Sequence, residues 1–346
     1  MKTWMKAALA GLLLAVLAAG AGLYAAWRYV ETPLDPESNA TTVFRVETGE
    51  SLRGVSAKLE TEGLVRHAEL FRTYGRYRKL PLQAGEFELS RAMSPRQILE
   101  VLAFGKPILY RLSFAEGLTM RDVALAVNAT GLTTAERFIK ACRDRDYLAS
   151  RGINATDAEG YLFPETYFFA RIPDQDPYPI LDALLERFRT SVADLPQAGD
   201  ADALHRMVIL ASLVEKETAL PAERPAVAGV YANRLRLGML LQCDPTIIYG
   251  LGENFDGNLR RSHLQDASNL YNTYVHPGLP PGPICSPGRA SLQAASSPEE
   301  HEFLYFVARP DGSHQFSRTL REHTNAVIRH QRKGRPFAAG ETGRAD

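Results

Sequence analysis

The sequence predicts an α+β protein with an N-terminal transmembrane helix, a small α/β module, and then a larger, mainly helical domain with a small sheet. Three observations predict this class. An uncharged apolar run opens the chain, apolar residues at helical spacing with capping residues dominate the rest, and short alternating runs beside turn residues indicate a few strands. The 346 residues are enough for two or three domains with cores of their own.

The first segment, residues 1–28, is predicted to be a membrane anchor. No charge occurs from Ala7 to Trp27, and a helix of that length reaches about 31 Å, close to the thickness of a bilayer's hydrocarbon core. Two lysines precede the run, so the positive-inside rule places the N-terminus in the cytoplasm and the rest of the chain outside. A cleaved signal peptide is the alternative, because small residues at 18–21 could form a cleavage site. The length of the run favours the uncleaved anchor.

Beyond the anchor, composition and periodicity divide the chain into five parts. These are a polar linker at 29–42, an α/β module at 43–106, an intermediate α/β subdomain at 107–175, a mainly helical domain at 176–335 and a disordered tail at 336–346. In the module, the alternation of Val43 and Arg45 with Phe44 and Val46 predicts a strand. Near the C-terminus, two apolar runs around Pro310-Asp311-Gly312 predict a hairpin.

Composition narrows the classes of function. Acidic and basic residues balance at 40 each, which argues against nucleic acid as the main partner, because phosphate binding requires a basic excess. Three cysteines do not form a disulfide scaffold, although Cys243 and Cys285 could pair in an oxidising compartment and leave Cys142 free. No H-E-x-x-H motif, nucleophile elbow or P-loop occurs, so we expect no cofactor and no metal.

The stretch "ASLVEKETA" places two carboxylates on one predicted helix. At about 100° per residue, Glu217 falls about 20° from Leu210, inside the apolar stripe, whereas Glu215 falls about 140° away and is expected on the solvated face. Burying a carboxylate is costly unless another group satisfies it or the site uses it. Glu217 therefore either forms a buried ion pair, with Arg224 or Arg234, or acts as a proton donor whose pKa is raised by apolar surroundings.

The segment after this helix combines tyrosines, amides, glycines and prolines with apolar residues. Such side chains suit a carbohydrate, which presents hydroxyl groups and C–H faces. Each of them has an alternative role as a hydrogen-bonding group within the loop itself, and Asp244 before a proline also fits a turn or helix start. The candidate binding residues are Asn233, Gln242, Asp244, Thr246, Tyr249, Tyr271 and Asn272.

Two long stretches carry a specific family resemblance. "ASLVEKETALPAERPAVAGVYANRLRLGMLLQCDPTIIYGLG" and "YNTYVHPGLPPGPICSPG" resemble the YceG-like (MltG) endolytic murein transglycosylases. Within residues 43–106, "VETGESLRGVSAKLETEGLV" resembles the LysM pattern of glycan binders, and a structural spacer without a ligand is the alternative for this module. An anchor, a LysM-like module and a catalytic domain follow one another in the family's order, which assigns residues 176–335 to the catalytic YceG-like domain. The resemblance implies that Glu217, the second glutamate of E-K-E-T, is the catalytic acid. Cys243 stands where relatives often carry threonine or serine.

The resemblance also implies a reaction and a location. The expected reaction is non-hydrolytic cleavage of the MurNAc-β-1,4-GlcNAc bond of nascent peptidoglycan strands, which leaves 1,6-anhydroMurNAc ends and terminates strand elongation. The expected partners are glycan strands and the peptidoglycan synthases at the membrane. The expected place is the bacterial inner membrane, crossed once, with the catalytic domain in the periplasm. The alternatives are a hydrolytic muramidase and a non-catalytic, membrane-anchored scaffold that binds peptidoglycan.

Overall fold

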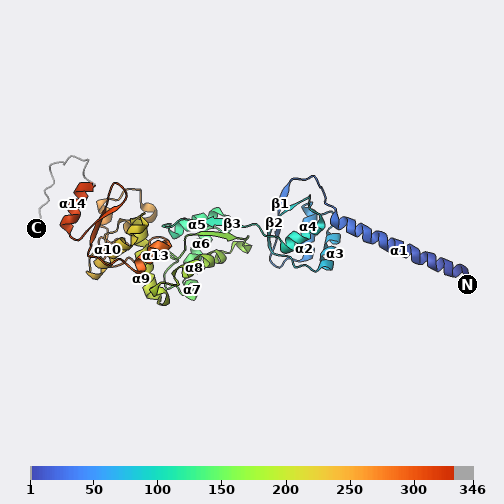
Figure 1. The fold of residues 1–346 in the computed structure, drawn as a ribbon, viewed down its shortest axis with the longest axis horizontal. Helices are drawn as coiled ribbons and strands as arrows, with labels where there is room; N and C mark the ends of the chain where they lie inside the picture. The colour runs from blue at the N-terminus through green and yellow to red at the C-terminus, as the bar shows by residue number, and fades with distance from the viewer. Residues whose placement is uncertain (1, 331–346) are drawn as a thin grey trace. The chain divides into compact units, whose positions relative to one another are not determined.

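The structure, a computed structural model, describes residues 2–330 and consists of two compact units (Figure 1). Unit 1 comprises the chain up to Tyr110 together with Phe168–Asp174, and unit 2 comprises Arg111–Tyr167 and the chain from Gln175 onward. The segment expected as an intermediate subdomain thus groups mostly with the C-terminal part. The exact boundaries of the five sequence-based parts remain predictions. The tail expected at 336–346 lies outside the described residues.

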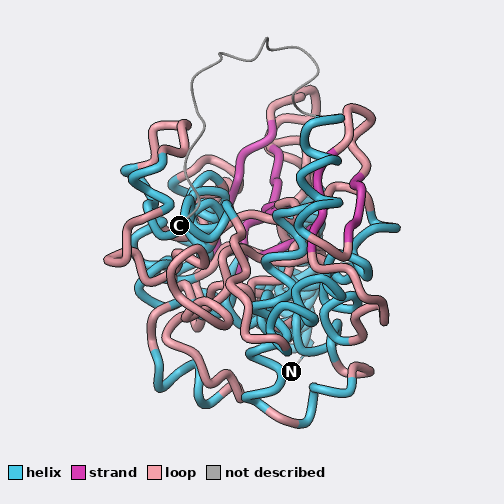
Figure 2. Tube along the Cα trace, turned by 90° about the vertical axis from the view of Figure 1, so that its left-hand side faces the viewer, coloured by secondary structure: helices cyan, strands magenta, loops and turns pink. Residues whose placement is uncertain are grey.

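Helices and loops predominate over strands (Figure 2). The helices are α1 (Lys2–Glu31), α2 (Leu52–Thr61), α3 (Ala68–Arg78), α4 (Pro95–Phe104), α5 (Met120–Ala129), α6 (Ala135–Cys142), α7 (Arg145–Ser150), α8 (Tyr178–Val192), α9 (Ala201–Glu217), α10 (Arg224–Arg236), α11 (Asp244–Leu251), α12 (Arg261–Leu264), α13 (Arg289–Ser296) and α14 (Leu320–His330). The strands are β1 (Thr41–Val46), β2 (Gly85–Ser90), β3 (Tyr110–Ser113), β4 (Thr166–Phe169), β5 (Tyr305–Ala308) and β6 (His314–Ser317). They form three two-stranded sheets, β1–β2, β3–β4 and β5–β6.

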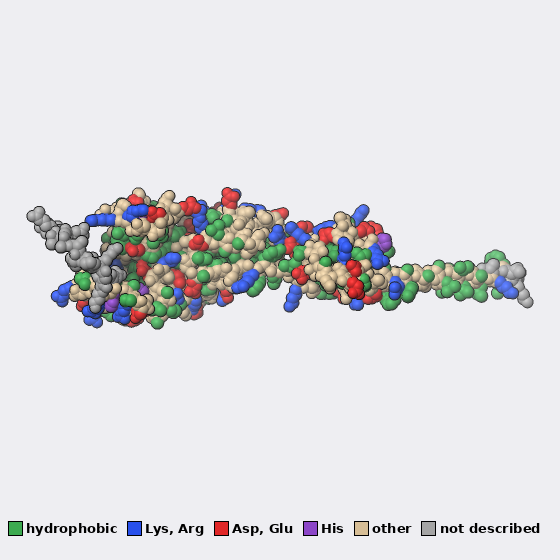
Figure 3. All heavy atoms as spheres, turned by 90° about the horizontal axis from the view of Figure 1, so that it is seen from above, with side chains coloured by type: hydrophobic (Ala, Val, Ile, Leu, Met, Phe, Trp, Pro, Cys, Tyr) green, Lys and Arg blue, Asp and Glu red, His purple; other side chains and the backbone are tan. Residues whose placement is uncertain are grey.

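Helix α1 exposes its apolar side chains along its length (Figure 3). Among the described residues it is the one helix long and apolar enough to cross a bilayer, over Trp4–Glu31, and none of its most apolar window is buried against the rest of the chain. A core helix would be buried, whereas a membrane anchor and a signal peptide share these features. The sequence-predicted anchor is therefore compatible with the structure.

Residues 41–104 fold around one small core. Strand β1 runs antiparallel to β2 with Phe44 opposite Phe87, and both phenylalanines are fully buried. Between the strands, α2 begins where the Ser51 hydroxyl accepts the Gly54 N–H. Helix α4 follows with a capping box at Ser94 and a proline as its first residue, a combination that favours a helix start. The α/β character of this module is confirmed.

In unit 2, α9 is the central helix. It packs against α10, α11 and α13, and every residue from Met207 to Val214 is buried. The hairpin predicted around Pro310–Gly312 is confirmed, with Tyr305 of β5 opposite Ser317 of β6, and α14 packs on both strands. Over residues 207–214, α9 therefore has no solvent-exposed face.

The three cysteines are free and buried. The Cys285 thiol donates to the Ser212 carbonyl oxygen at 3.4 Å, whereas Cys243 makes a separate contact with Glu217. The Cys243–Cys285 pairing that the sequence left open is therefore not formed in this structure.

Candidate active site

Glu217 is the last residue of α9, and its carboxyl meets buried side chains of α10 and of the segment before α11. The Tyr231 hydroxyl on α10 donates a hydrogen bond to Glu217 Oε1 at 2.8 Å, and the Cys243 thiol, just before α11, also hydrogen-bonds to this carboxylate. Tyr231 and Cys243 are both buried. Burial raises the pKa of Glu217 above the usual carboxyl value, and the two hydrogen bonds offset part of that rise.

Neither arginine that could have neutralised Glu217 does so. Arg224 pairs with Glu215 at 3.0 Å. Arg234 Nε donates to the Leu304 carbonyl at 2.7 Å, and its Nη1 donates to the Leu241 carbonyl at 2.7 Å. In the part of the chain that the structure describes, Glu217 takes part in no ion pair. The ion-pair alternative is therefore wrong, and the carboxyl lies in a low-dielectric site that favours its neutral form.

The expectation that Glu215 is solvent-exposed is also wrong. Its side chain is 6% exposed, is paired with Arg224, and accepts the Gly288 N–H at 3.0 Å. Glu116 lies 3.5 Å from the same guanidinium. The helical wheel failed because it treated the polar face of α9 as solvent, whereas Arg224 and the start of α13 cover that face. Of the two glutamates near the end of α9, Glu215 is thus paired with an arginine, whereas Glu217 takes part in no ion pair among the described residues.

Two titratable side chains other than its hydrogen-bond partners also affect the pKa of Glu217. The Asp244 carboxylate raises the pKa of Glu217, and His314 on β6 lowers it. His314 Nδ1 lies 2.7 Å from Glu223 Oε2, and the Glu223 carboxylate also accepts the His314 N–H at 2.9 Å. This contact links the β5–β6 hairpin to the turn at Pro221–Glu223 beside the end of α9.

Gln242 and Asp244 are exposed on either side of the buried Cys243 in sequence. Gln242 has a positive φ of 50°, and its N–H donates to the Thr273 carbonyl at 3.1 Å. Asp244 accepts the Tyr274 hydroxyl at 2.6 Å. Because Cys243 contacts Glu217, the chain carries both exposed side chains past the carboxyl, where a bound substrate could reach them.

Three other expected binding residues make internal hydrogen bonds. Thr246 and Asn272 are 0% exposed, with Thr246 donating to the Cys243 carbonyl at 2.7 Å and the Asn272 amide donating to three carbonyls between residues 263 and 266. The Asn233 amide donates to the carbonyls of His301 and Phe303. Because their polar groups already have partners, we no longer expect these three residues to contact substrate. We expect them to hold the loops around the site in place.

Tyr249 and Tyr271 lie against each other with ring centroids 4.8 Å apart. Both are partly exposed, and the Tyr249 hydroxyl donates to Glu159 at 3.1 Å. Tyr271 also lines a cavity of about 380 Å³ whose wall includes Gly282 and Pro283. Tyrosine and proline side chains of the segment after α9, which the sequence indicated as suited to a carbohydrate, thus line one cavity.

Among residues 2–330, no group of three or more His, Cys, Asp or Glu side chains is placed to ligate an ion.

The family model described as the YceG-like family matches residues 44–329. The chain belongs to the YceG-like family. A protein of Bacillus subtilis strain 168 named endolytic murein transglycosylase is 28% identical over 312 residues, spanning 85% of this chain and 86% of the relative. One of the same name from Streptococcus pneumoniae serotype 2 is 28% identical over 353 residues, spanning 92% of this chain and 63% of the relative. The 2.6 Å crystal structure of a YceG-like protein from Listeria monocytogenes has a TM-score of 0.57 and 30% identity, covering 84% of this chain and 100% of that one.

Sequence reasoning missed two residues of this YceG-like site. Tyr231 lies among apolar residues in the sequence of α10, and no local pattern predicts that its hydroxyl donates a hydrogen bond to Glu217. Glu159 is 3% exposed, accepts the Met120 N–H at 2.9 Å, and has its pKa raised to about 8 by burial. A carboxylate directly before the apolar run "GYLF" was the available signal for Glu159.

Proposed function

We propose that this YceG-like protein is an endolytic peptidoglycan lytic transglycosylase with Glu217 as its single acid and base. One observation supports this most: the Glu217 side chain is largely removed from water, takes part in no ion pair among residues 2–330, and has two hydrogen-bonding neighbours, Tyr231 and Cys243. A carboxyl with a raised pKa can hold a proton near neutral pH and donate it. The names of the relatives, endolytic murein transglycosylase, agree with this chemistry.

In the first step, Glu217 donates its proton to the glycosidic oxygen between MurNAc and GlcNAc. The bond from MurNAc C1 to that oxygen breaks, GlcNAc leaves with a 4-hydroxyl group, and positive charge develops at C1. Glu217 becomes a carboxylate, which the Tyr231 hydroxyl stabilises through its hydrogen bond to Oε1. Tyr231 thus stabilises the negative charge that develops on Glu217 during bond cleavage.

In the second step, the C6 hydroxyl of the same MurNAc attacks C1, and Glu217 takes its proton. The product is a 1,6-anhydroMurNAc end, no water is consumed, and the glutamic acid is restored. Because the nucleophile is part of the substrate, attack is intramolecular, and this proximity replaces what a second carboxylate would supply. A dedicated nucleophilic aspartate is then unnecessary.

The remaining site residues fall into two groups, those expected to contact the glycan and those that hold the surrounding loops. We propose that Gln242, Asp244, Tyr249 and Tyr271 contact the glycan, since each is at least partly exposed and the tyrosine pair offers faces for sugar C–H groups. Thr246, Asn272 and Asn233 hold the surrounding loops through their internal bonds.

A second candidate function is a hydrolytic muramidase, and one observation favours it. Hydrolases of this bond type use a second carboxylate to activate water or to attack the sugar, and the Asp244 charge acts on Glu217. The exposed Asp244 is the candidate for that role. If the protein is a transglycosylase, Asp244→Asn is expected to keep its activity within about tenfold of the wild type. If it is a hydrolase that uses Asp244 as the general base, the same variant is expected to lose activity by roughly 10²-fold or more.

Product analysis separates the two reactions. Purified glycan strands are digested in water labelled with heavy oxygen, and the new ends are identified by mass spectrometry. We expect 1,6-anhydro ends without label. Reducing ends that carry the label would establish hydrolysis instead. Strands that stay intact would support the third alternative, a scaffold that binds peptidoglycan without cleaving it.

We further propose that the protein is a single-pass protein of the bacterial inner membrane with its site in the periplasm, and that it ends elongation of nascent strands beside the synthases. Helix α1 supports the anchor by length and composition. The β1–α2–α3–β2 order of the module supports a LysM-like role in holding glycan. Deleting residues 1–31 is expected to retain cleavage of purified strands but to abolish shortening of strands in cells. Equal shortening by the released form would contradict a role for the anchor.

A further inference from the structure

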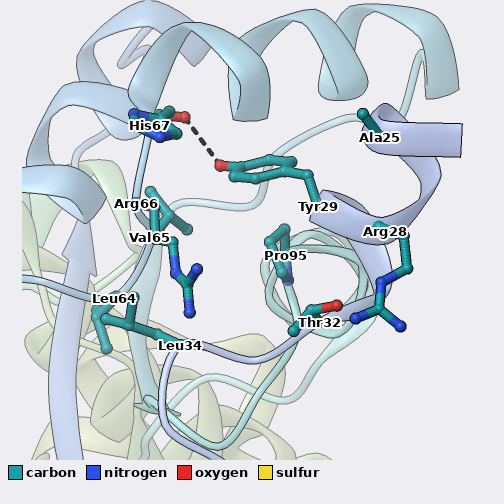
Figure 4. Close-up of a pocket in the computed structure, with 10 residues that line it drawn as sticks. All are labelled: Ala25, Arg28, Tyr29, Thr32, Leu34, Leu64, Val65, Arg66, His67 and Pro95. Atoms are coloured by element: carbon teal, nitrogen blue, oxygen red, sulfur yellow. Dashed lines mark hydrogen bonds between the residues drawn. The ribbon is translucent and has the colours of Figure 1, made fainter. Parts of the chain in front are cut away.

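A cavity lies where α1 meets the module of unit 1 (Figure 4). Its volume is about 280 Å³, and one water takes about 30 Å³ of liquid, so a phosphate-sized group fits with room to spare. Arg28 and Tyr29 line it from the last turns of α1, Arg66 and His67 from the segment between α2 and α3, and Pro95 from the start of α4.

Three contacts fix the end of α1 on the module and so form this cavity in advance. The Tyr29 hydroxyl donates to the His67 carbonyl at 2.9 Å (Figure 4). Glu31, the last residue of α1, pairs with Arg96 of α4 at 3.0 Å. The Asp35 N–H donates to the Arg91 carbonyl at 3.0 Å. The two arginines that line the cavity are therefore presented by parts of the chain held in a defined relation.

The cavity has unbalanced positive charge. Arg28 and Arg66 come from different elements and lie on either side of Pro95 in Figure 4. Within residues 2–330, no side-chain hydrogen bond or ion pair is formed by either guanidinium, and Glu31 is paired with Arg96. Glu60 acts on Tyr29 but does not line the cavity. Two guanidinium groups facing one space suit an anion, and their planar donors match phosphate oxygens.

The position along α1 indicates where that anion comes from. Ala25, inside the apolar run that ends at Trp27, also lines the cavity, and Arg28 is the first charge after the run. Tyr24 and Trp27 pack with ring centroids 5.9 Å apart, and such aromatic residues favour the boundary between hydrocarbon and headgroups. A molecule bound here meets two arginines together with Ala25 of the apolar run, a combination that suits the phosphate of a phospholipid at the boundary with its acyl chains.

We propose that this cavity binds the phosphate group of an anionic membrane lipid, with the acyl chains lying along α1. The proposal rests on the proposed anchoring of α1 in a membrane. Lipid binding at this point ties the module to the membrane surface at the headgroup level. It is independent of the chemistry at Glu217.

Native mass spectrometry of the full-length protein in detergent tests the proposal, with dioleoyl phosphatidylglycerol as the probe. Each arginine near an anionic surface is worth roughly a fivefold change in affinity, so the double variant Arg28→Gln/Arg66→Gln is expected to bind the lipid roughly 30-fold more weakly. The matched control is Arg53→Gln/Arg76→Gln, which removes two exposed arginines of α2 and α3 that do not line the cavity. That control is expected to bind as the wild type does.

Two control ligands test whether the cavity requires the phosphate group of a lipid. Dioleoylglycerol, which has the same chains without phosphate, is expected not to bind, and excess inorganic phosphate is expected not to displace the lipid. Equal loss in both double variants, binding of the phosphate-free lipid, or displacement by free phosphate would each overturn the proposal. A wild-type chain that leaves membranes without detergent would instead refute the anchor, so the two failures are distinguishable.

Discussion

Replacing Tyr231 with phenylalanine tests how the protein controls the proton on Glu217. The change removes the hydroxyl that donates to Glu217 Oε1 at 2.8 Å. It keeps the ring, whose edge packs against Phe306 at 6.0 Å between centroids. The fold around Glu217 should therefore survive, while the carboxyl loses one of its two hydrogen-bonding neighbours.

The size of the effect follows from the type of bond. A hydrogen bond to a charged group contributes about 1.5–3 kcal/mol, and 1.36 kcal/mol corresponds to one pH unit. The Tyr231 hydroxyl favours the ionised carboxyl and so lowers its pKa. Its loss is expected to raise the pKa of Glu217 by about 1–2 pH units.

The assay is the pH dependence of kcat/KM for glycan cleavage, which reports groups of the free enzyme. Glu217 must be protonated to begin the reaction, so activity falls as the pH rises through its pKa. In Tyr231→Phe, this falling limb is expected to move to higher pH by about 1–2 units. Tyr249→Phe is the matched control, because its hydroxyl bonds Glu159 instead, and its falling limb should stay in place. A limb that is unmoved or moves to lower pH in Tyr231→Phe would refute the assignment of Glu217 as the proton donor.

Three further predictions concern stability, measured by denaturant unfolding. Glu215→Gln is expected to cost about 3 kcal/mol, the lower end for breaking a buried ion pair, because Glu116 remains 3.5 Å from Arg224; a change below about 1 kcal/mol, the worth of a surface pair, would contradict the burial of this pair. Glu217→Gln is expected to become more stable relative to the wild type as the pH rises, because the folded wild type holds its proton more tightly than the unfolded chain; a pH-independent difference would count against a raised pKa. For Glu159, the stability gained from its proton is fully present below the unfolded pKa of about 4.3 and is lost as the pH rises through its folded pKa of about 8, so Glu159→Gln should remove this part of the pH dependence, and an unchanged profile would contradict it.

The elements that the sequence predicted well are those whose signals are local. Ser94 before a proline predicts the start of α4, and the structure has the full capping box there. The turn residues at 310–312 predict the hairpin of β5 and β6. In both cases, the residues that determine the conformation are neighbours in the chain, so no tertiary information is needed.

The site was only partly predictable, because its electrostatics depend on distant parts of the chain. The wheel placed Glu217 on the apolar side of α9 correctly, since Leu213 and Val214 are buried beside it. It misplaced Glu215, because burial of a charge depends on Arg224 and Gly288, which a pattern of apolar residues does not register. The burial of Thr246 and Asn272 likewise depends on how the loops fold over one another.

The rate of strand cleavage by Glu217→Gln tests the central claim most directly. A general acid and base contributes about 10²- to 10⁴-fold, and glutamine keeps the shape of the side chain without its proton. We expect a folded variant that produces anhydro ends at least about 100-fold more slowly than the wild type. A folded variant that still cleaves strands within about tenfold of the wild-type rate would show that the proton comes from another group.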